Sequence, residues 1–74
     1  MTDRLPIITP RQLVGVLIHL GFEKKRQRGS HAFFFHEDGR HTTVSIHSKD
    51  IKRNLLRKVL RDIRISEEKL KEYL

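Results

Sequence analysis

The sequence predicts an α+β fold, in which a three-stranded antiparallel sheet packs against two helices and a short third helix follows. Two segments, residues 10–20 and 51–63, carry apolar residues at helical spacing. Between them, residues 22–46 are rich in β-branched and aromatic residues and contain two glycine turns. Because such a sheet buries one face against its flanking helices, we expect both helices on one face and an open face opposite.

The first helix is predicted to run from Pro10 to about Leu20. Thr9 and Gln12 have the spacing of a capping box, and Pro10 falls at the first helical position, where its missing N–H is harmless. Gly21 suits the left-handed residue that ends a helix. The apolar stripe is expected to consist of Leu13, Val14, Leu17, Ile18 and Leu20.

Three strands are predicted at about residues 22–28, 31–36 and 41–46, and the register of the last pair decides which way His31 points. A two-residue turn at Asp38-Gly39 sets His31 opposite Ile46, toward the core. A three-residue loop with Gly39 in a left-handed bulge sets His31 opposite Ser45, on the open face. The second register also brings Phe33, Phe35 and His47 to that face, and periodicity alone does not separate the two.

The helical period returns after residue 48. Asn54 is the expected N-cap of the second helix, which leaves residues 49–53 as a basic loop, and Ser66 opens a short last helix. The second helix has a cationic face with Asp62 as the single acid of residues 51–66, and we expect this face to follow phosphates. Its members are Lys52, Arg53, Arg57, Lys58, Arg61 and Arg64.

Composition favours a nucleic-acid partner. The 74 residues hold 16 Lys and Arg against 9 Asp and Glu, a net charge of +7. There are no cysteines, which excludes disulfides and thiolate zinc sites, and His36 and His41 have no further ligands at a suitable spacing, so we expect neither metal nor cofactor. No apolar run is long enough to span a bilayer and the opening residues lack a signal-peptide core, so we expect a cytoplasmic protein without a membrane partner.

A series of short motifs carries a resemblance to a known family. In chain order they are Gly21-Phe22, Gly29-Ser30-His31, His36-x-Asp38-Gly39-Arg40, Val44-x-x-His47, Leu56-Arg57-x-Val59-Leu60-Arg61 and Ile65-Ser66. Over residues 9–70 their order and spacing resemble the HicA (YcfA-type) toxin family. Two positions depart from the family pattern: Ser45 stands where the family usually carries Pro, and Asn54 where it usually carries Gly.

The resemblance implies one domain over residues 1–74 with a double-stranded-RNA-binding-domain-like α-β-β-β-α fold. It implies an mRNA interferase of a type II toxin–antitoxin pair, neutralised by a HicB-type antitoxin, with His31 as the catalytic residue. The catalytic His of the family must reach RNA, so the resemblance also favours the three-residue loop.

The chemistry of these residues suits metal-independent cleavage of RNA. RNA brings its own nucleophile, the 2′-hydroxyl, and imidazole, with an ordinary pKa of about 6.5, moves protons near neutral pH. His31 is therefore the candidate general acid or base, with His47 and Ser45 as candidate auxiliaries. The candidate RNA-binding residues are Lys24, Lys25, Arg26, Arg28, Gly29, Ser30, Lys49, Lys52, Arg53 and Arg57.

Two other functions fit the same residues. Without the resemblance, Gly29-Ser30-His31 is more simply a turn before a strand, and the chain is then a non-catalytic module that binds double-stranded RNA by shape. Phe33 and Phe35 suit either base stacking or the docking of a protein partner.

Overall fold

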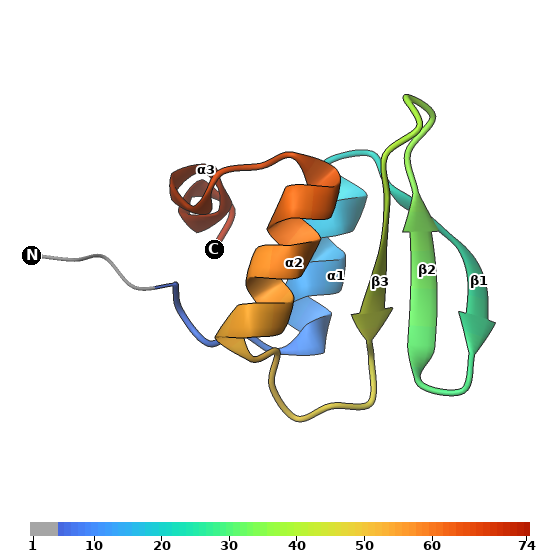
Figure 1. Ribbon diagram of the computed structural model, residues 1–74, viewed down its shortest axis with the longest axis horizontal. Helices are drawn as coiled ribbons and strands as arrows, with labels where there is room; N and C mark the ends of the chain where they lie inside the picture. The colour runs from blue at the N-terminus through green and yellow to red at the C-terminus, as the bar shows by residue number, and fades with distance from the viewer. Residues whose placement is uncertain (1–4) are drawn as a thin grey trace, which may run out of the picture.

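The computed structural model describes residues 5–74 and confirms the predicted α-β-β-β-α order with a short C-terminal helix. The first four residues of the predicted domain lie outside this range. The three strands form one antiparallel sheet in the order β1-β2-β3 (Figure 1). The elements are α1 (Pro10–His19), β1 (Glu23–Arg28), β2 (His31–Phe35), β3 (His41–Ser45), α2 (Arg53–Ile63) and α3 (Glu67–Glu72).

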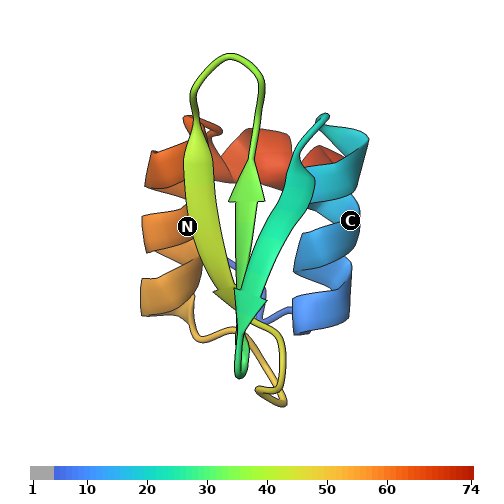
Figure 2. The same ribbon diagram turned by 90° about the vertical axis from the view of Figure 1, so that its right-hand side faces the viewer.

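The two longer helices cover one face of the sheet and leave the other face open. Figure 2 shows the sheet in front, with α2 behind β3 and α1 behind β1. The short helix α3 lies on the side of α1 and α2 that is remote from the sheet (Figure 1). This arrangement confirms the predicted open face. None of the helices within residues 5–74 has the length and apolar character that crossing a membrane would require.

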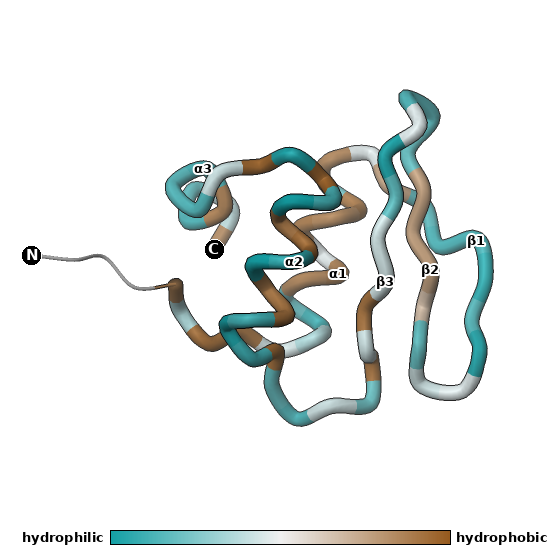
Figure 3. The backbone as a smooth tube through the Cα atoms, viewed as in Figure 1, coloured by the Kyte–Doolittle hydropathy of each residue, from teal (hydrophilic) through white to brown (hydrophobic). Residues whose placement is uncertain are grey.

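The core lies between the sheet and the helices. In β2 and β3 burial alternates, so that Ala32, Phe34, Thr42 and Val44 point inward while their neighbours point to the open face. All six residues of β1 are exposed, and this strand is hydrophilic along its length (Figure 3). The helices contribute Leu13, Val16, Leu17, Leu56, Val59, Leu60, Ile63 and Leu70 to the core.

The start and end of α1 follow the sequence signals. The Gln12 backbone N–H donates to Thr9 Oγ1 (3.1 Å), the Thr9 N–H donates to Gln12 Oε1 (2.9 Å), and Gly21 follows the helix with a φ of 96°. The predicted stripe is partly wrong, because Val16 is buried whereas Ile18 is 60% exposed. Ile18 is rotated by about 100° from Leu17 around the helix axis and therefore points away from the sheet.

The start of α2 differs from the prediction. The helix begins at Arg53 with Lys52 as its N-cap, so the predicted Asn54 cap is wrong. Tertiary contacts hold the chain before the helix: the Ile51 N–H donates to the Ile8 carbonyl (2.7 Å) and Arg53 Nε donates to the Leu5 carbonyl (2.7 Å). These long-range bonds fix the first turn although Lys52 makes no side-chain capping bond.

The hairpin between β2 and β3 has the three-residue loop. His31 pairs with Ser45 and Ala32 with Val44, which excludes the register that turned His31 toward the core. The Gly39 N–H donates to the His36 carbonyl (2.9 Å), and Gly39 has a φ of 100°, as a type I turn followed by a glycine bulge requires.

Candidate functional site

The outward-pointing residues of the sheet form three rows that cross the strands on the open face. Residues directly opposite each other in antiparallel strands have Cα atoms about 4.5–5.5 Å apart, so each row brings side chains from three strands together. The rows are Arg28, His31 and Ser45; Arg26, Phe33 and Thr43; and Glu23, Phe35 and His41.

His31 occupies the middle of the first row, at the exposed start of β2. The preceding turn sets Arg28 directly opposite it: Gly29 has a φ of 57° and Ser30 a negative φ, the sign pattern of a type II′ turn. On the other side, the Ile46 N–H donates to the Ser30 carbonyl (2.8 Å). Because ladder bonds alternate, His31 and Ser45 form a non-hydrogen-bonded pair, the closer of the two antiparallel spacings.

A groove of about 280 Å³ opens beside this row, between β3 and α2. Its polar lining comes from His31, Thr43, Ser45 and Lys58, and Lys58 is the cation that α2 contributes. Lys58 lies 3.3 Å from Asp62 and keeps 62% of its side chain exposed. The sequence placed Lys58 on the cationic helix face but did not single it out, because only the packing of α2 against β3 shows which cation faces the groove. The apolar lining consists of Leu13, Val44, Ile51, Leu55 and Val59.

Aromatic rings occupy the next two rows. The guanidinium carbon of Arg26 lies 5.7 Å from the centre of the Phe33 ring. The Phe35 and His41 rings are stacked, with centroids 5.6 Å apart and an interplanar angle of 14°. Phe35 is 41% exposed. Phe33 and Phe35 therefore share the face of His31, as the three-residue loop predicts, and His41 joins them from β3.

The predicted cations of β1 divide between the two faces. Arg26 and Arg28 pair with Phe33 and His31 and lie on the open face. Lys24 pairs with the inward-pointing Phe34, and its Nζ donates to Gln27 Oε1 (3.0 Å). Of the predicted phosphate ligands in β1, Arg28 is thus directly opposite His31 and Arg26 lies in the next row on the same face.

Lys25 stands at the bulge of β1 and pairs with an acid. Its Nζ lies 2.8 Å from the Glu23 carboxylate. The hydrogen bond from Lys25 holds the pKa of Glu23 below its usual range.

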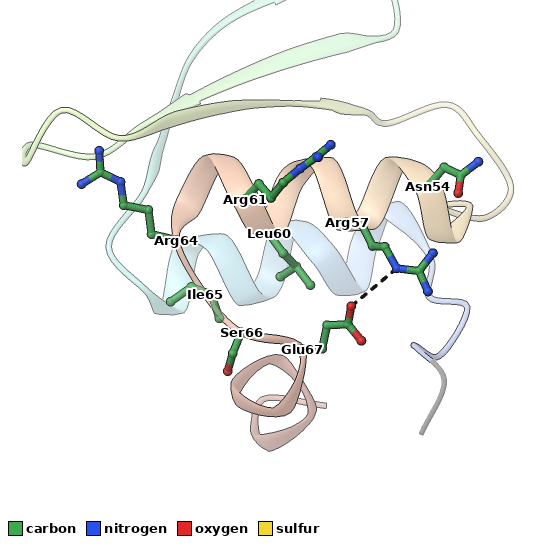
Figure 4. A pocket seen from close by; sticks show the side chains of 8 residues that line it. All are labelled: Asn54, Arg57, Leu60, Arg61, Arg64, Ile65, Ser66 and Glu67. Carbon is green, nitrogen blue, oxygen red and sulfur yellow. Dashed lines mark ion pairs between the residues drawn. The ribbon is translucent and has the colours of Figure 1, made fainter. Parts of the chain in front are cut away.

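Two further predicted cations, Arg53 and Arg57, make their contacts outside the first row. Arg53 is bonded to the Leu5 carbonyl, and Arg57 points toward Glu67, with 3.5 Å between Nε and Oε2 (Figure 4). Both Arg57 and Glu67 line a larger groove of about 610 Å³ between α2 and α3. That groove holds no histidine, so the smaller groove beside His31 is the better candidate site. Lys49, Lys52 and His47 are exposed on the segment between β3 and the first turn of α2.

Comparison with known proteins identifies the family of the chain. A family model described as the HicA toxin of bacterial toxin–antitoxin systems matches residues 10–65. The match extends from the start of α1 past the end of α2 and includes all nine residues of the three rows. A comparison with curated proteins gave no match.

Proposed function

Because the chain belongs to the HicA toxin family of bacterial toxin–antitoxin systems, we propose that it is a metal-independent endoribonuclease that cleaves mRNA and is neutralised by a HicB-type antitoxin. The observation that supports this proposal most directly is the row in which an exposed His31 stands between Arg28 and Ser45 on an open sheet face. mRNA as substrate places the protein in the cytoplasm.

The proposed reaction is transesterification at phosphorus. The 2′-oxygen of the RNA attacks the adjacent phosphorus, the bond from phosphorus to the 5′-oxygen breaks, and the products are a 2′,3′-cyclic phosphate and a free 5′-hydroxyl. His31 takes the proton from the 2′-hydroxyl or gives one to the leaving 5′-oxygen. Arg28 supplies positive charge to the phosphorane, whose charge exceeds that of the starting phosphodiester.

A second proton transfer needs a second group. Ser45 lies opposite His31, and its Oγ is 3.0 Å from Ser48 Oγ, so its hydroxyl is held by a short polar chain. His47 follows β3 and is exposed. We assign the second proton transfer to His47, because an imidazole can take up and release a proton near neutral pH, and we assign to the Ser45 hydroxyl a hydrogen bond to the phosphate. Lys58 on the far side of the groove attracts the RNA backbone.

The decisive experiment replaces His31. We expect His31→Ala to reduce cleavage of a defined RNA to background in the presence of a chelator, because the variant lacks the proton-transfer group. The matched control is His19→Ala, which removes another exposed histidine from α1, where it contacts Tyr73 rather than the sheet. Circular dichroism and thermal unfolding check that both variants fold.

Two results would contradict the proposal. One is a folded His31→Ala protein that cleaves RNA like the parent. The other is a parent protein that binds RNA duplexes without cleaving any RNA, which would favour the double-stranded-RNA-binding module.

A further inference from the structure

We propose that the open face beside His31 is a base-stacking platform for single-stranded RNA, in which Phe33 holds one nucleobase and the Phe35–His41 pair holds the next. This inference rests on the endoribonuclease function proposed above and adds the form of RNA that the site accepts. It assigns a substrate-binding role to two rings and one imidazole outside the row of His31.

The spacing of the rings suits successive nucleotides. His31, Phe33 and Phe35 are alternate residues of the central strand, so they follow one another in steps of about 6.7 Å on one face. The RRM, a different RNA-binding fold, likewise stacks two or three bases on aromatic residues of its sheet. Phe33 and Phe35 therefore follow His31 along β2, on one side of the proposed cleavage point.

The surroundings of each ring supply what a base and its phosphate need. Arg26 lies 5.7 Å from the centre of Phe33, so a cation accompanies the first ring. His41 stacks against the second ring, with the two planes within 14° of parallel, so a base that joins this pair continues an existing stack. A hollow of about 170 Å³ adjoins both rings, and it is lined by Thr43 and by Lys58 with its ion-pair partner Asp62. Among the residues that the structure describes, Arg26 is thus the cation next to the rings that has no acidic partner in the same hollow.

Charge distinguishes an RNA ligand from a protein partner at this face. Arg26 lies in the row of Phe33 and Arg28 in the neighbouring row of His31, so guanidinium groups that can bind phosphate stand on both sides of the first ring's row. The net charge of +7 also attracts a polyanion. A duplex keeps its bases stacked inside, where these rings cannot reach them, so the ligand is single-stranded.

The test measures binding of a short single-stranded 2′-O-methyl RNA, which cannot be cleaved because its 2′-oxygen is blocked. With the full chain we expect Phe33→Leu and Phe35→Leu each to raise the Kd roughly 5- to 150-fold, since stacking on one aromatic residue contributes about that much. Leu keeps an apolar side chain but removes the ring. Phe35→Tyr restores a ring and should bind like the parent. The matched control, Ile18→Ala, removes a side chain that is 60% exposed on α1 and should leave the Kd unchanged.

Two further probes separate bases from backbone. The two probes are an abasic strand of equal length and the matched duplex. For each probe, the parent and both Leu variants should have the same Kd. The inference is overturned if the Leu variants bind the single strand as tightly as the parent, or if they lose equal affinity for the abasic strand. It is also overturned if they bind RNA normally but lose affinity for a copurifying antitoxin, because the rings are then a protein-docking patch.

The two proposals fail separately. Ring-dependent binding of the single strand by a protein that cleaves no RNA supports the platform and contradicts the endoribonuclease. Cleavage that is lost in His31→Ala but is unchanged, in kcat/KM, in both Leu variants overturns the platform and supports the endoribonuclease.

Discussion

Arg28 differs from the other cations of β1 in the face it occupies and in its surroundings. It lies opposite His31, and within residues 5–74 its guanidinium has no hydrogen-bond or ion-pair partner. Lys24 is held by Gln27 on the other side of the strand, and Lys25 is paired with Glu23. A free guanidinium has several donors that match phosphate oxygens. Its position in the row of His31, and not its charge alone, therefore distinguishes Arg28 from the other cations of β1.

We predict unequal effects when Arg28 and Lys24 lose their charge. Arg28→Gln should lower the rate of RNA cleavage at saturating RNA by about 100-fold, a loss typical of removing one donor to a developing oxyanion. Lys24→Gln removes the same charge from the opposite face, so it should weaken RNA binding slightly and leave the saturated rate unchanged. Single-turnover cleavage measures both quantities. Equal losses of the saturated cleavage rate in the two variants would mean that these cations act only through the net positive charge of the protein.

The β2–β3 hairpin is fastened at its tip by Asp38 and Arg40. The Arg40 N–H donates to Asp38 Oδ1 (3.0 Å), Arg40 Nε donates to Oδ2 (2.8 Å), and Arg40 Nη1 donates to the Ile63 carbonyl at the end of α2 (2.6 Å). Arg40 also lies over the Phe22 ring, with 5.1 Å to its centroid. The loop that sets the register of β2 against β3, and hence the direction of His31, is thus tied to the helical layer.

The stability that Asp38 contributes should depend on pH. The backbone N–H of Arg40, with its side chain, holds the pKa of the Asp38 carboxyl below its usual range. A lowered native pKa means that the carboxylate stabilises the fold above the unfolded-state pKa of about 3.9, and that this stabilisation is lost as pH falls through the native pKa. Asp38→Asn should therefore unfold more easily than the parent at pH 7.

Urea titrations of the parent and Asp38→Asn at several pH values check this expectation. The difference between their unfolding free energies should shrink as the pH falls below about 4. A difference that is constant from pH 7 to pH 3 would show that the carboxylate charge does not contribute. Glu37→Gln in the same loop is the control, because no ion pair or hydrogen bond of Glu37 is present within residues 5–74.

The two faces of the sheet differ across the whole molecule: one packs against the helices in the core, and the open face carries the candidate functional residues. Phe34 is 1% exposed in the core, whereas Phe35 is 41% exposed on the open face. A 74-residue domain has a total stability of roughly 4–11 kcal/mol, so loss of one large core side chain removes a large share of it. The open face can carry exposed aromatic and charged residues because its side chains contribute little to the free energy of unfolding.

Adjacent substitutions in β2 should separate these two sides. Phe34→Ala should destabilise the fold by about 3–5 kcal/mol, as expected for truncating a buried Phe, and every activity should fall with the folded fraction. Phe35→Ala should cost about 1 kcal/mol or less, because its ring is half exposed and its main partner is His41. Urea unfolding of both variants measures the contrast. Similar losses in the two variants would contradict the assignment of Phe35 to an open face.

Much of the fold and the composition of the site were predictable from short-range patterns. Some features depend on residues only a few positions apart and can be predicted from one sequence: the capping box of Thr9 and Gln12, the left-handed Gly21 and the apolar period of α2. The start of α2 could not be predicted in this way, because hydrogen bonds from Ile51 and Arg53 to a segment more than forty residues earlier fix it. The family resemblance, rather than periodicity, favoured the hairpin register that the structure confirms.

The order of helices and strands, the basic charge and the Gly-Ser-His turn next to aromatic residues were all predictable from the sequence. The folded structure was needed to show that Arg28 and Ser45 flank His31, that Arg26 covers Phe33, and that Lys58 rather than Arg57 faces the groove. A shift of one residue in strand pairing turns every side chain to the opposite face, and neighbouring helix residues differ by about 100° in direction. Local sequence leaves such choices nearly equal in energy, and packing of distant segments against one core selects one of them.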